Sequence, residues 1–220
     1  MVFGKAFAPS SLLGRLFVSL TDAPATVLVF DGDSISIGLG AQPGLTLAEQ
    51  VVALLPPGVT SHVVGAGGRP VKDCLSLFDA DVRPLYDPRA RHNVIFFHAG
   101  DNDITQGSTG RQAYAALTAY VARAHAQGWK VVLSTEMQRY DLPEAMRAEL
   151  DTFNALMLAN AAGADGVADF GGDATMGGVE NRRDRRYYTI DGVHPADAGY
   201  AILAGLAAKA LLPCLNAGPR

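Results

Sequence analysis

The sequence lacks the features that mark several large classes of protein. Its 220 residues include only two cysteines, Cys74 and Cys214, and neither lies in the CxxC or Cys/His spacing of a metal or redox site. We interpret both as small apolar residues, with a single disulfide as the alternative. No apolar run reaches the roughly 18 residues that a membrane helix needs, so we expect no transmembrane segment.

The chain also lacks an excess of basic charge and a long polar linker. Its 18 basic and 22 acidic residues give a net charge of −4, which should not attract nucleic acid or an anionic membrane. Hydrophobic residues make up 49% of the sequence, enough for one sizeable core. We therefore expect one domain and no nucleic-acid partner.

The N-terminal region carries no convincing export signal. The apolar stretch SSLLGRLFVSL is interrupted by Arg15, although APA at 23–25 resembles a signal-peptide cleavage site. We interpret residues 1–25 as a segment that packs on a single domain formed by residues 26–220, with a cleaved export signal as the alternative. The sequence leaves the compartment open, with the cytoplasm as the default.

Short apolar runs rich in β-branched and aromatic residues alternate with longer segments of helical period, which is typical of βαβ units and a parallel sheet. The predicted strands are 26–30, 61–65, 93–99, 130–135 and 166–170. The predicted helices lie within 46–58, 108–128, 142–163 and 196–212. Thr46 and Glu49 have capping-box spacing, and Gly128 stands where a C-terminal glycine cap is expected. Residues 171–190 are too rich in glycine for a helix.

The loop after the first strand, FDGDS, is compatible with two enzyme chemistries. In an open parallel sheet ligands bind beyond the carboxyl ends of the strands, where this loop lies. Asp31 as nucleophile, with Asp33 as acid/base and Mg²⁺ between them, would fit a haloacid-dehalogenase-like phosphatase. That chemistry also needs a lysine and a second acidic pair, but Lys130 precedes its strand and GGDATMGG supplies only one aspartate.

The second interpretation takes Ser34 as the nucleophile, in a turn that Gly32 makes possible. A base is available in TIDGVHPADAGY, where His194 follows Asp191 by three residues. Around a turn this spacing lets the Asp191 carboxylate orient the imidazole and stabilise the imidazolium. The loop does not fit the G-x-S-x-G elbow of α/β-hydrolases, because Ser36 replaces the second glycine.

Acyl transfer also needs donors aimed at the oxyanion of the tetrahedral intermediate. Gly67 and Gly68 follow the second strand and could present backbone N–H groups. Asn102 follows the third strand and could present its side-chain amide. The N–H of Ser34 itself is the third candidate.

Four blocks in order across almost the whole chain resemble the SGNH or GDSL-like hydrolase superfamily. They are Gly32-Asp33-Ser34, a glycine after the second strand, Gly100-x-Asn102-Asp103 and Asp191-x-x-His194. The resemblance implies a three-layer α/β/α sandwich with a five-stranded parallel sheet, flavodoxin-like, and no metal or cofactor. It also implies ester hydrolysis, with lipids, short acyl esters, acyl thioesters or acetylated sugars as substrates.

The resemblance implies a catalytic triad of Ser34, Asp191 and His194. It implies an oxyanion hole formed by the N–H of Ser34, the N–H of Gly67 and the amide of Asn102. Family members often have asparagine two residues before the oxyanion glycine, where this chain has Gly65. The choice between Gly67 and Gly68 therefore stays open.

Several polar residues near these blocks have a structural and a functional interpretation. As substrate contacts we consider Asp33, His98, Arg182, Arg183 and Tyr187. Structurally, Asp33 would accept hydrogen bonds from loop N–H groups, His98 would be a packing residue, and the run Asn181–Arg186 would be solvated. The same run could hold an anionic substrate group. A carboxylate cluster for Mg²⁺ or Ca²⁺ is a further alternative, and its members would be Asp31, Asp33, Asp101 and Asp103.

We therefore expect a serine esterase that hydrolyses carboxylic esters through an acyl-enzyme. The expected substrates are short acyl or acetyl esters of carbohydrate or lipid. The alternatives are the Mg²⁺-dependent phosphatase that uses Asp31 and a non-catalytic glycan-binding module. The sequence does not specify the acyl chain, the leaving group or the oligomeric state.

Overall fold

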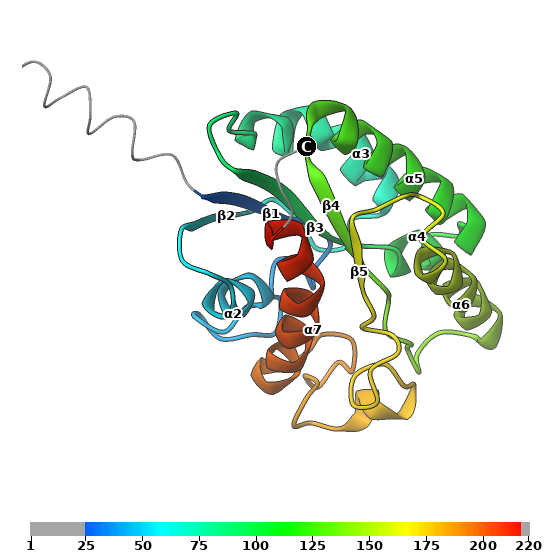
Figure 1. The fold of residues 1–220 in the computed structure, drawn as a ribbon. Coiled ribbons are helices and arrows are strands. Elements are labelled where there is room, and N and C mark those ends of the chain that lie inside the picture. The colour runs from blue at the N-terminus through cyan, green and yellow to red at the C-terminus, as the bar shows by residue number, and fades with distance from the viewer. Residues whose placement is uncertain (1–24, 217–220) are drawn as a thin grey trace, which may run out of the picture.

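The computed structural model describes residues 25–216, which form a five-stranded parallel sheet with strand order β2-β1-β3-β4-β5 (Figure 1). The strands are β1 Thr26–Gly32, β2 Val59–Val63, β3 His92–His98, β4 Lys130–Ser134 and β5 Gly166–Ala168. This order reverses direction between β1 and β3, and such a switch point opens a crevice at the carboxyl ends of the two strands. The N-terminal segment predicted at 1–25 lies, except for Ala25, outside the described residues.

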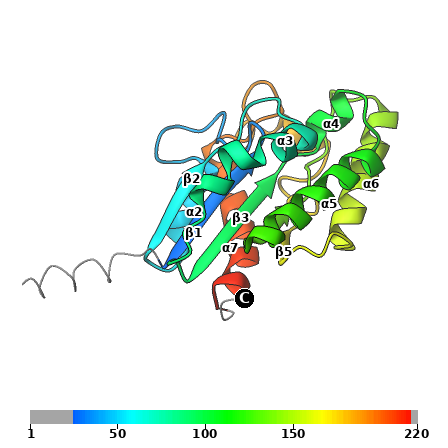
Figure 2. The same cartoon turned by 90° about the horizontal axis from the view of Figure 1, so that it is seen from above.

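Helices cover both faces of the sheet, which confirms the three-layer arrangement (Figures 1 and 2). On one face, α3 Val71–Asp81, α5 Gly110–Gln127 and α6 Glu144–Leu158 contribute to a core with Val27 and Val29 of β1. On the other, α2 Leu47–Leu54 and α7 Asp197–Asn216 contribute to a core with Leu28 and Phe30. Successive side chains of a strand point to opposite faces, so a strand buried on both faces reads as a continuous apolar run.

Two predicted helix ends are confirmed by their caps, whereas the helix predicted within 142–163 ends earlier, at Leu158. Thr46 and Glu49 form a capping box at α2, and Gly128 ends α5 with a left-handed φ of 96°. Two helices were not predicted: α3, and the five-residue α4 Asp101–Thr105. The second is too short to show a helical period, and α3 buries only one narrow stripe of side chains.

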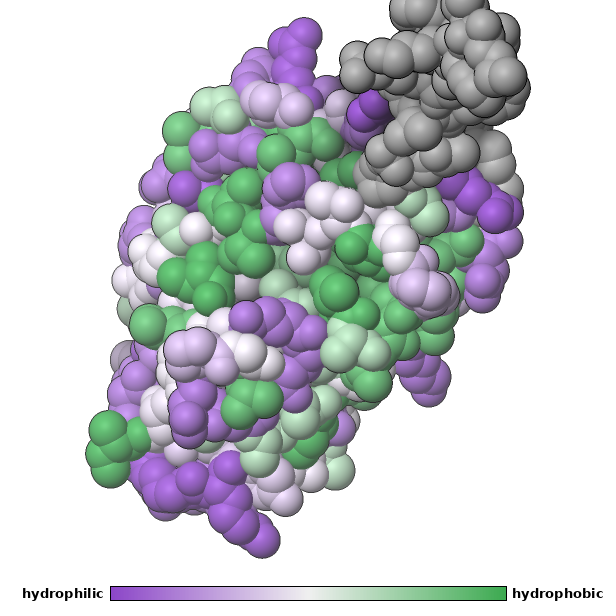
Figure 3. All heavy atoms as spheres, turned by 90° about the vertical axis from the view of Figure 1, so that its left-hand side faces the viewer, coloured by the Kyte–Doolittle hydropathy of each residue, from purple (hydrophilic) through white to green (hydrophobic). Residues whose placement is uncertain are grey.

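The central strands and the edge strand differ in exposure. All residues of β1 and β3 are buried, whereas β2, at the edge, has exposed residues and begins two positions earlier than the predicted run 61–65. Leu54 of α2 and Val63 of β2 are about half exposed. Figure 3 shows this side of the molecule, where hydrophobic and hydrophilic residues are interspersed over most of the surface.

α7 is strongly apolar, and it packs in the core of the domain. Among the described residues it is the one helix long and apolar enough to cross a membrane. Its buried residues include Tyr200, Leu203 and Leu211, which lie in the core on the α2 side of the sheet. Both cysteines are buried, Cys74 in the α3 core and Cys214 in the α7 core, and neither forms a disulfide within residues 25–216, which confirms their interpretation as apolar residues.

The glycine-rich segment 171–190 folds as turns with one short 3₁₀ helix, η2 Glu180–Arg183. Arg182 is 2% exposed, so the interpretation of the run Asn181–Arg186 as solvated is wrong for this residue, and its burial gives no support to a substrate contact. Its guanidinium donates hydrogen bonds to the carbonyls of Met137, Gln138 and Val193, at 2.5–2.8 Å, and lies 4.7 Å from the centre of the Tyr188 ring. Arg182 therefore ties the loop after β4 to the residue before His194.

Replacing Arg182 should cost much more stability than replacing its exposed neighbour Arg183, which pairs with Glu180 at 2.8 Å. Arg182→Met keeps much of the side-chain volume but leaves three carbonyls without a donor, and should lower the free energy of unfolding by about 2–4 kcal/mol. Arg183→Met should change it by less than about 0.5 kcal/mol. Urea unfolding of both variants is the measurement, and equal losses would contradict this role of Arg182.

Candidate active site

Ser34 lies in a tight turn at the carboxyl end of β1, beside the end of β3. Gly32 has a φ of +134°, and a Cβ atom there would lie 1.9 Å from the carbonyl oxygen of His98. Only glycine fits this approach of the two strands. The N–H of Asp33 donates to the same carbonyl at 3.0 Å, and Ser36 Oγ donates to it at 3.1 Å. These contacts fix the backbone on both sides of Ser34.

Ser34, His194 and Asp191 form a continuous hydrogen-bonded chain. His194 Nε2 lies 2.9 Å from Ser34 Oγ, and His194 Nδ1 lies 2.6 Å from Asp191 Oδ2. Asp191 and His194 come from the loop that leads into α7. The N–H of Thr189 donates to the His194 carbonyl at 2.9 Å, which closes this loop on itself. Residues 160 positions apart in sequence thus meet at the switch point of the sheet.

The Asp191 carboxylate is held by several donors besides the imidazole. Oδ1 accepts hydrogen bonds from the Thr189 hydroxyl at 2.6 Å and from the N–H groups of Val193 and His194 at 2.8 and 3.0 Å. Burial acts to raise the pKa of Asp191, but the hydrogen bonds from His194 and Thr189 outweigh it and hold the pKa below its ordinary value. Asp191 is therefore an anion wherever an imidazole can act as a base.

Possible oxyanion donors surround Ser34. A Cβ atom on Gly67 would lie 3.9 Å from Ser34 Cβ, whereas one on Gly68 would have no atom within 4 Å. Within residues 25–216 the N–H groups of Ser34 and Gly67 have no hydrogen-bond acceptor. Asn102, in the first turn of α4, has its amide nitrogen 3.4 Å from Asp33 Oδ2. At Gly65 a Cβ would lie 2.9 Å from the Gly32 carbonyl oxygen, so the backbone of the nucleophile turn leaves little room for asparagine there.

Asp33 and His98 lie beneath the turn and not on its surface. Asp33 is 1% exposed, and its Oδ1 accepts the N–H of Ile35 at 2.9 Å, which agrees with the structural interpretation. His98 is fully buried, with Nδ1 2.7 Å from Ser134 Oγ, and burial lowers its pKa to about 4. This burial gives no support to the alternative prediction, that these two side chains contact substrate.

Arg183 and Tyr187 lie nearer the surface and remain predicted substrate contacts. The Arg183 guanidinium lies 5.5 Å from the centre of the Tyr140 ring, and Arg183 pairs with Glu180. Tyr187 is partly buried, with the Arg186 guanidinium 5.2 Å from its ring centre. Tyr140 borders the catalytic loop, since a Cβ on Gly192 would lie 2.5 Å from its ring.

The four aspartates considered as a cation site have separate partners. Asp31 is 1% exposed, accepts the Tyr120 hydroxyl at 2.6 Å and lies 3.7 Å from Arg69. Asp101 pairs with Arg139 at 2.8 Å, and Asp103 accepts the N–H of Val71 at 2.7 Å. Among the described residues the one group of potential metal ligands is instead Asp33, His98 and Glu136. The predicted four-aspartate cluster does not form.

Sequence reasoning missed Glu136 and Arg139, two of the three charged residues of the loop after β4. Glu136 is 1% exposed, and Arg139 bridges Asp101 and Asp141 at 2.8 and 2.6 Å. The available signal was position, because both follow a buried strand at the carboxyl edge of the sheet, where the other site residues lie.

Comparison with solved structures gives close likeness of fold at low sequence identity. A member of the lipolytic G-D-S-L family from Veillonella parvula is 24% identical with a TM-score of 0.70, over 85% of this chain and 98% of that one. A psychrotrophic esterase from Pseudoalteromonas sp. is 15% identical (TM-score 0.67; 88% and 100% covered), and an acetylxylan esterase from Geobacillus stearothermophilus is 20% identical (TM-score 0.60; 88% and 95%).

The sequence itself was compared with curated proteins and with family models. No curated protein matches the chain. The model of the GDSL-like lipase/acylhydrolase family matches residues 30–202, a range that holds the nucleophile turn, both candidate oxyanion elements and the Asp191–His194 loop. The chain therefore belongs to the GDSL-like lipase/acylhydrolase family.

Proposed function

We propose that the protein is a serine esterase that hydrolyses carboxylic esters through an acyl-enzyme, with Ser34, His194 and Asp191 as its catalytic triad. The observation that carries this proposal is the chain of two hydrogen bonds, 2.9 and 2.6 Å long, from Ser34 Oγ through the imidazole to the Asp191 carboxylate. A serine hydroxyl is a weak nucleophile until a base removes its proton, and this chain supplies the base and its orienting anion.

In the acylation step His194 Nε2 takes the proton of Ser34 Oγ as the oxygen attacks the ester carbonyl. The imidazolium is stabilised by Asp191, which is already an anion. Collapse of the tetrahedral intermediate breaks the bond to the alcohol, which leaves with the proton that His194 returns. In deacylation a water molecule gives its proton to His194 and attacks the acyl group, and Ser34 Oγ recovers a proton as the acid departs.

The oxyanion would be held by the N–H groups of Ser34 and Gly67 and by the side-chain amide of Asn102. Free N–H groups beside the nucleophile support this assignment, since donors already in place need no rearrangement when negative charge develops. Gly67 is preferred to Gly68 because Gly67 is the one whose Cβ position lies near Ser34. The Asp33 carboxylate would orient Asn102 by accepting one of its two amide hydrogens.

The substrates we propose are short acyl or acetyl esters of carbohydrate or lipid alcohols. The likeness to an acetylxylan esterase makes acetylated sugars the first panel to test. The phosphatase alternative is not supported, because the Asp31 carboxylate is buried against Tyr120 and faces the α5 core. A non-catalytic glycan-binding module is disfavoured because nucleophile, base and orienting acid remain in hydrogen-bond contact.

Substitution of the proposed nucleophile tests the proposal directly. Ser34→Ala should lower kcat on p-nitrophenyl acetate on the order of 10⁴-fold, because no other group can form the acyl-enzyme. Ser76→Ala is the control, since Ser76 is an exposed serine of α3 whose hydroxyl donates to the carbonyl of Asp73 at 2.9 Å, away from the Ser34 turn. The control should change stability by less than about 0.5 kcal/mol and keep its activity. Comparable activity in both variants would contradict the role of Ser34.

Removing the orienting charge should affect kcat more than KM. Asp191→Asn keeps the shape of the side chain but favours the wrong imidazole tautomer, and should lower kcat roughly 10³- to 10⁴-fold. Asp184→Asn is the control in the same region, because Asp184 is paired with Arg186 at 2.5 Å and does not contact the imidazole. Steady-state kinetics on p-nitrophenyl acetate distinguish the two, and a similar small loss in both variants would count against the triad.

The amide of Asn102 should act only on the transition state. Asn102→Ala removes a neutral donor from the oxyanion and should reduce kcat about 10²- to 10³-fold with little change in KM. The measurement is the same ester assay combined with circular dichroism to confirm the fold. A change confined to KM would show that Asn102 binds substrate and does not stabilise the intermediate.

A further inference from the structure

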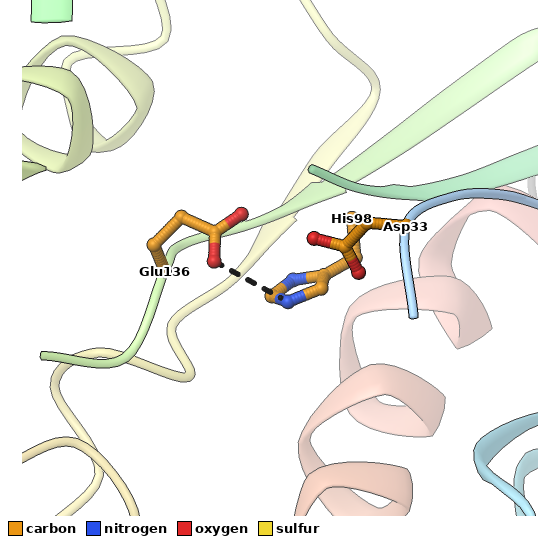
Figure 4. A group of neighbouring side chains, drawn as sticks. All are labelled: Asp33, His98 and Glu136. Atoms are coloured by element: carbon orange, nitrogen blue, oxygen red, sulfur yellow. Dashed lines mark ion pairs between the residues drawn. The ribbon is translucent and has the colours of Figure 1, made fainter. Parts of the chain in front are cut away.

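A buried acid-imidazole cluster lies behind the nucleophile turn. Asp33, His98 and Glu136 follow or end the neighbouring strands β1, β3 and β4, and none is more than 1% exposed. One ligand atom from each lies within 4.8 Å of the other two. Figure 4 shows the Glu136 carboxyl group directed at the His98 ring, with Asp33 on the other side of the ring.

The hydrogen bonds around His98 determine which ring nitrogen carries a proton. Ser134 Oγ donates its proton to the Phe97 carbonyl at 3.2 Å, so it accepts from His98 Nδ1 at 2.7 Å. A neutral His98 then has a lone pair on Nε2, which lies 3.4 Å from Glu136 Oε2. Within residues 25–216 neither His98 Nε2 nor Glu136 Oε1 has a hydrogen-bond partner. If Glu136 were ionised, its carboxylate lone pairs would face the lone pair on His98 Nε2 and repel it. A protonated Glu136 can instead donate a hydrogen bond to Nε2.

The surrounding charges also favour one proton in this cluster. Arg139 acts on Asp33 but pairs with Asp101 and Asp141, and Asp103 accepts a backbone N–H and faces Lys72. Arg182 is the cation that acts on Glu136, and one cation does not offset the repulsion between two ionised carboxyl groups. The titratable and charged groups that face Glu136 are Asp33, His98, Asp101, Asp103 and Arg182.

Asp33 is the better anion of the two remaining carboxyl groups. It accepts hydrogen bonds from the N–H of Ile35 and from the Asn102 amide, whereas Oε1 of the buried Glu136 carboxyl group has no hydrogen-bond partner within residues 25–216. Burial raises the pKa of Glu136, and the negative charges of Asp101 and Asp33 raise it further. Burial raises the pKa of Asp33 as well, so the two carboxyl groups compete for the same proton.

We propose that Glu136 is a protonated positioning residue, which shares its proton with His98 Nε2 and so leaves Asp33 ionised to orient the Asn102 amide. The state of Glu136 follows from the cluster alone, and only the consequence for Asn102 rests on the proposed function. A second negative charge at Glu136 would drive a proton onto Asp33 or displace its carboxylate, and Asn102 would lose its anchor.

The protonated state is tested by the pH dependence of unfolding in wild type and Glu136→Gln. The unfolded glutamate loses its proton near the ordinary value of 4.5, whereas folded Glu136 keeps it. Unfolding of the wild type therefore releases a proton that the glutamine variant does not have, and wild-type stability falls relative to the variant as pH rises. The ratio of the two unfolding constants should change about tenfold per pH unit above pH ~5, up to the folded pKa.

The control is Glu144→Gln, which replaces an exposed glutamate in the first turn of α6. The ratio of its unfolding constant to that of the wild type should change much less with pH than the ratio for Glu136→Gln. A constant ratio for Glu136→Gln, or one of opposite slope, would overturn the proposal. So would a slope that EDTA or added Zn²⁺ alters, because the cluster would then bind a cation. Infrared spectroscopy of the wild type at neutral pH should show a carboxylic-acid C=O band, and its absence would also overturn the proposal even if Glu136→Gln failed to fold.

The positioning role is tested by kinetics on p-nitrophenyl acetate. Glu136→Gln cannot acquire the second negative charge, so its Asp33 should stay ionised at every pH at which the wild type is folded. The kcat of the wild type should therefore fall relative to that of Glu136→Gln as the pH rises and Glu136 loses its proton, while the ratio of the two KM values stays constant. Parallel pH profiles of kcat in the two proteins would overturn the positioning role. An inactive wild type would instead contradict the proposed function, and the unfolding and infrared results would still decide the protonation of Glu136.

Discussion

The contact between the ends of β1 and β3 is the constraint on which the site depends. Gly32 lies so close to the His98 carbonyl that no Cβ atom fits, and the chain must then turn sharply through Asp33 and Ser34. The turn lies at the switch point of a parallel sheet, where helices on either side leave a crevice. The same approach of the strands buries His98 behind the Ser34 turn and brings the amide nitrogen of Asn102, four residues later, to 3.4 Å from Asp33 Oδ2.

A layer of buried polar groups supports this turn from below. Arg182 links the loop after β4 to the loop that carries His194, and Arg139 fixes Asp101 at the start of α4. Charged groups out of water are costly unless they are paired or hydrogen-bonded. The benefit of this arrangement is orientation, since it fixes the two segments that carry the proposed base His194 and the proposed amide donor Asn102.

Much of the fold and most of the candidate site were predictable from the sequence, because their signals are local. Alternating apolar runs indicated the five strands, and the Thr46 capping box and the Gly128 cap marked helix ends. The blocks around Ser34, Asn102 and His194 follow strands or precede α7, so their position implied that they meet. Arg182, His98 and Glu136 could not be interpreted in this way. Their roles depend on burial and on partners 36 to 45 positions away, and a charged run reads the same whether it is solvated or buried.

The central claim is that Ser34 forms a covalent acyl-enzyme, and labelling with a serine-directed fluorophosphonate tests it most directly. The wild-type protein is incubated with the probe in EDTA, and the modified peptide is located by mass spectrometry while p-nitrophenyl acetate hydrolysis is followed. The account predicts one label per chain, on Ser34, with activity lost in proportion. A label on another residue, or ester hydrolysis that persists after Ser34 is fully modified, would contradict it.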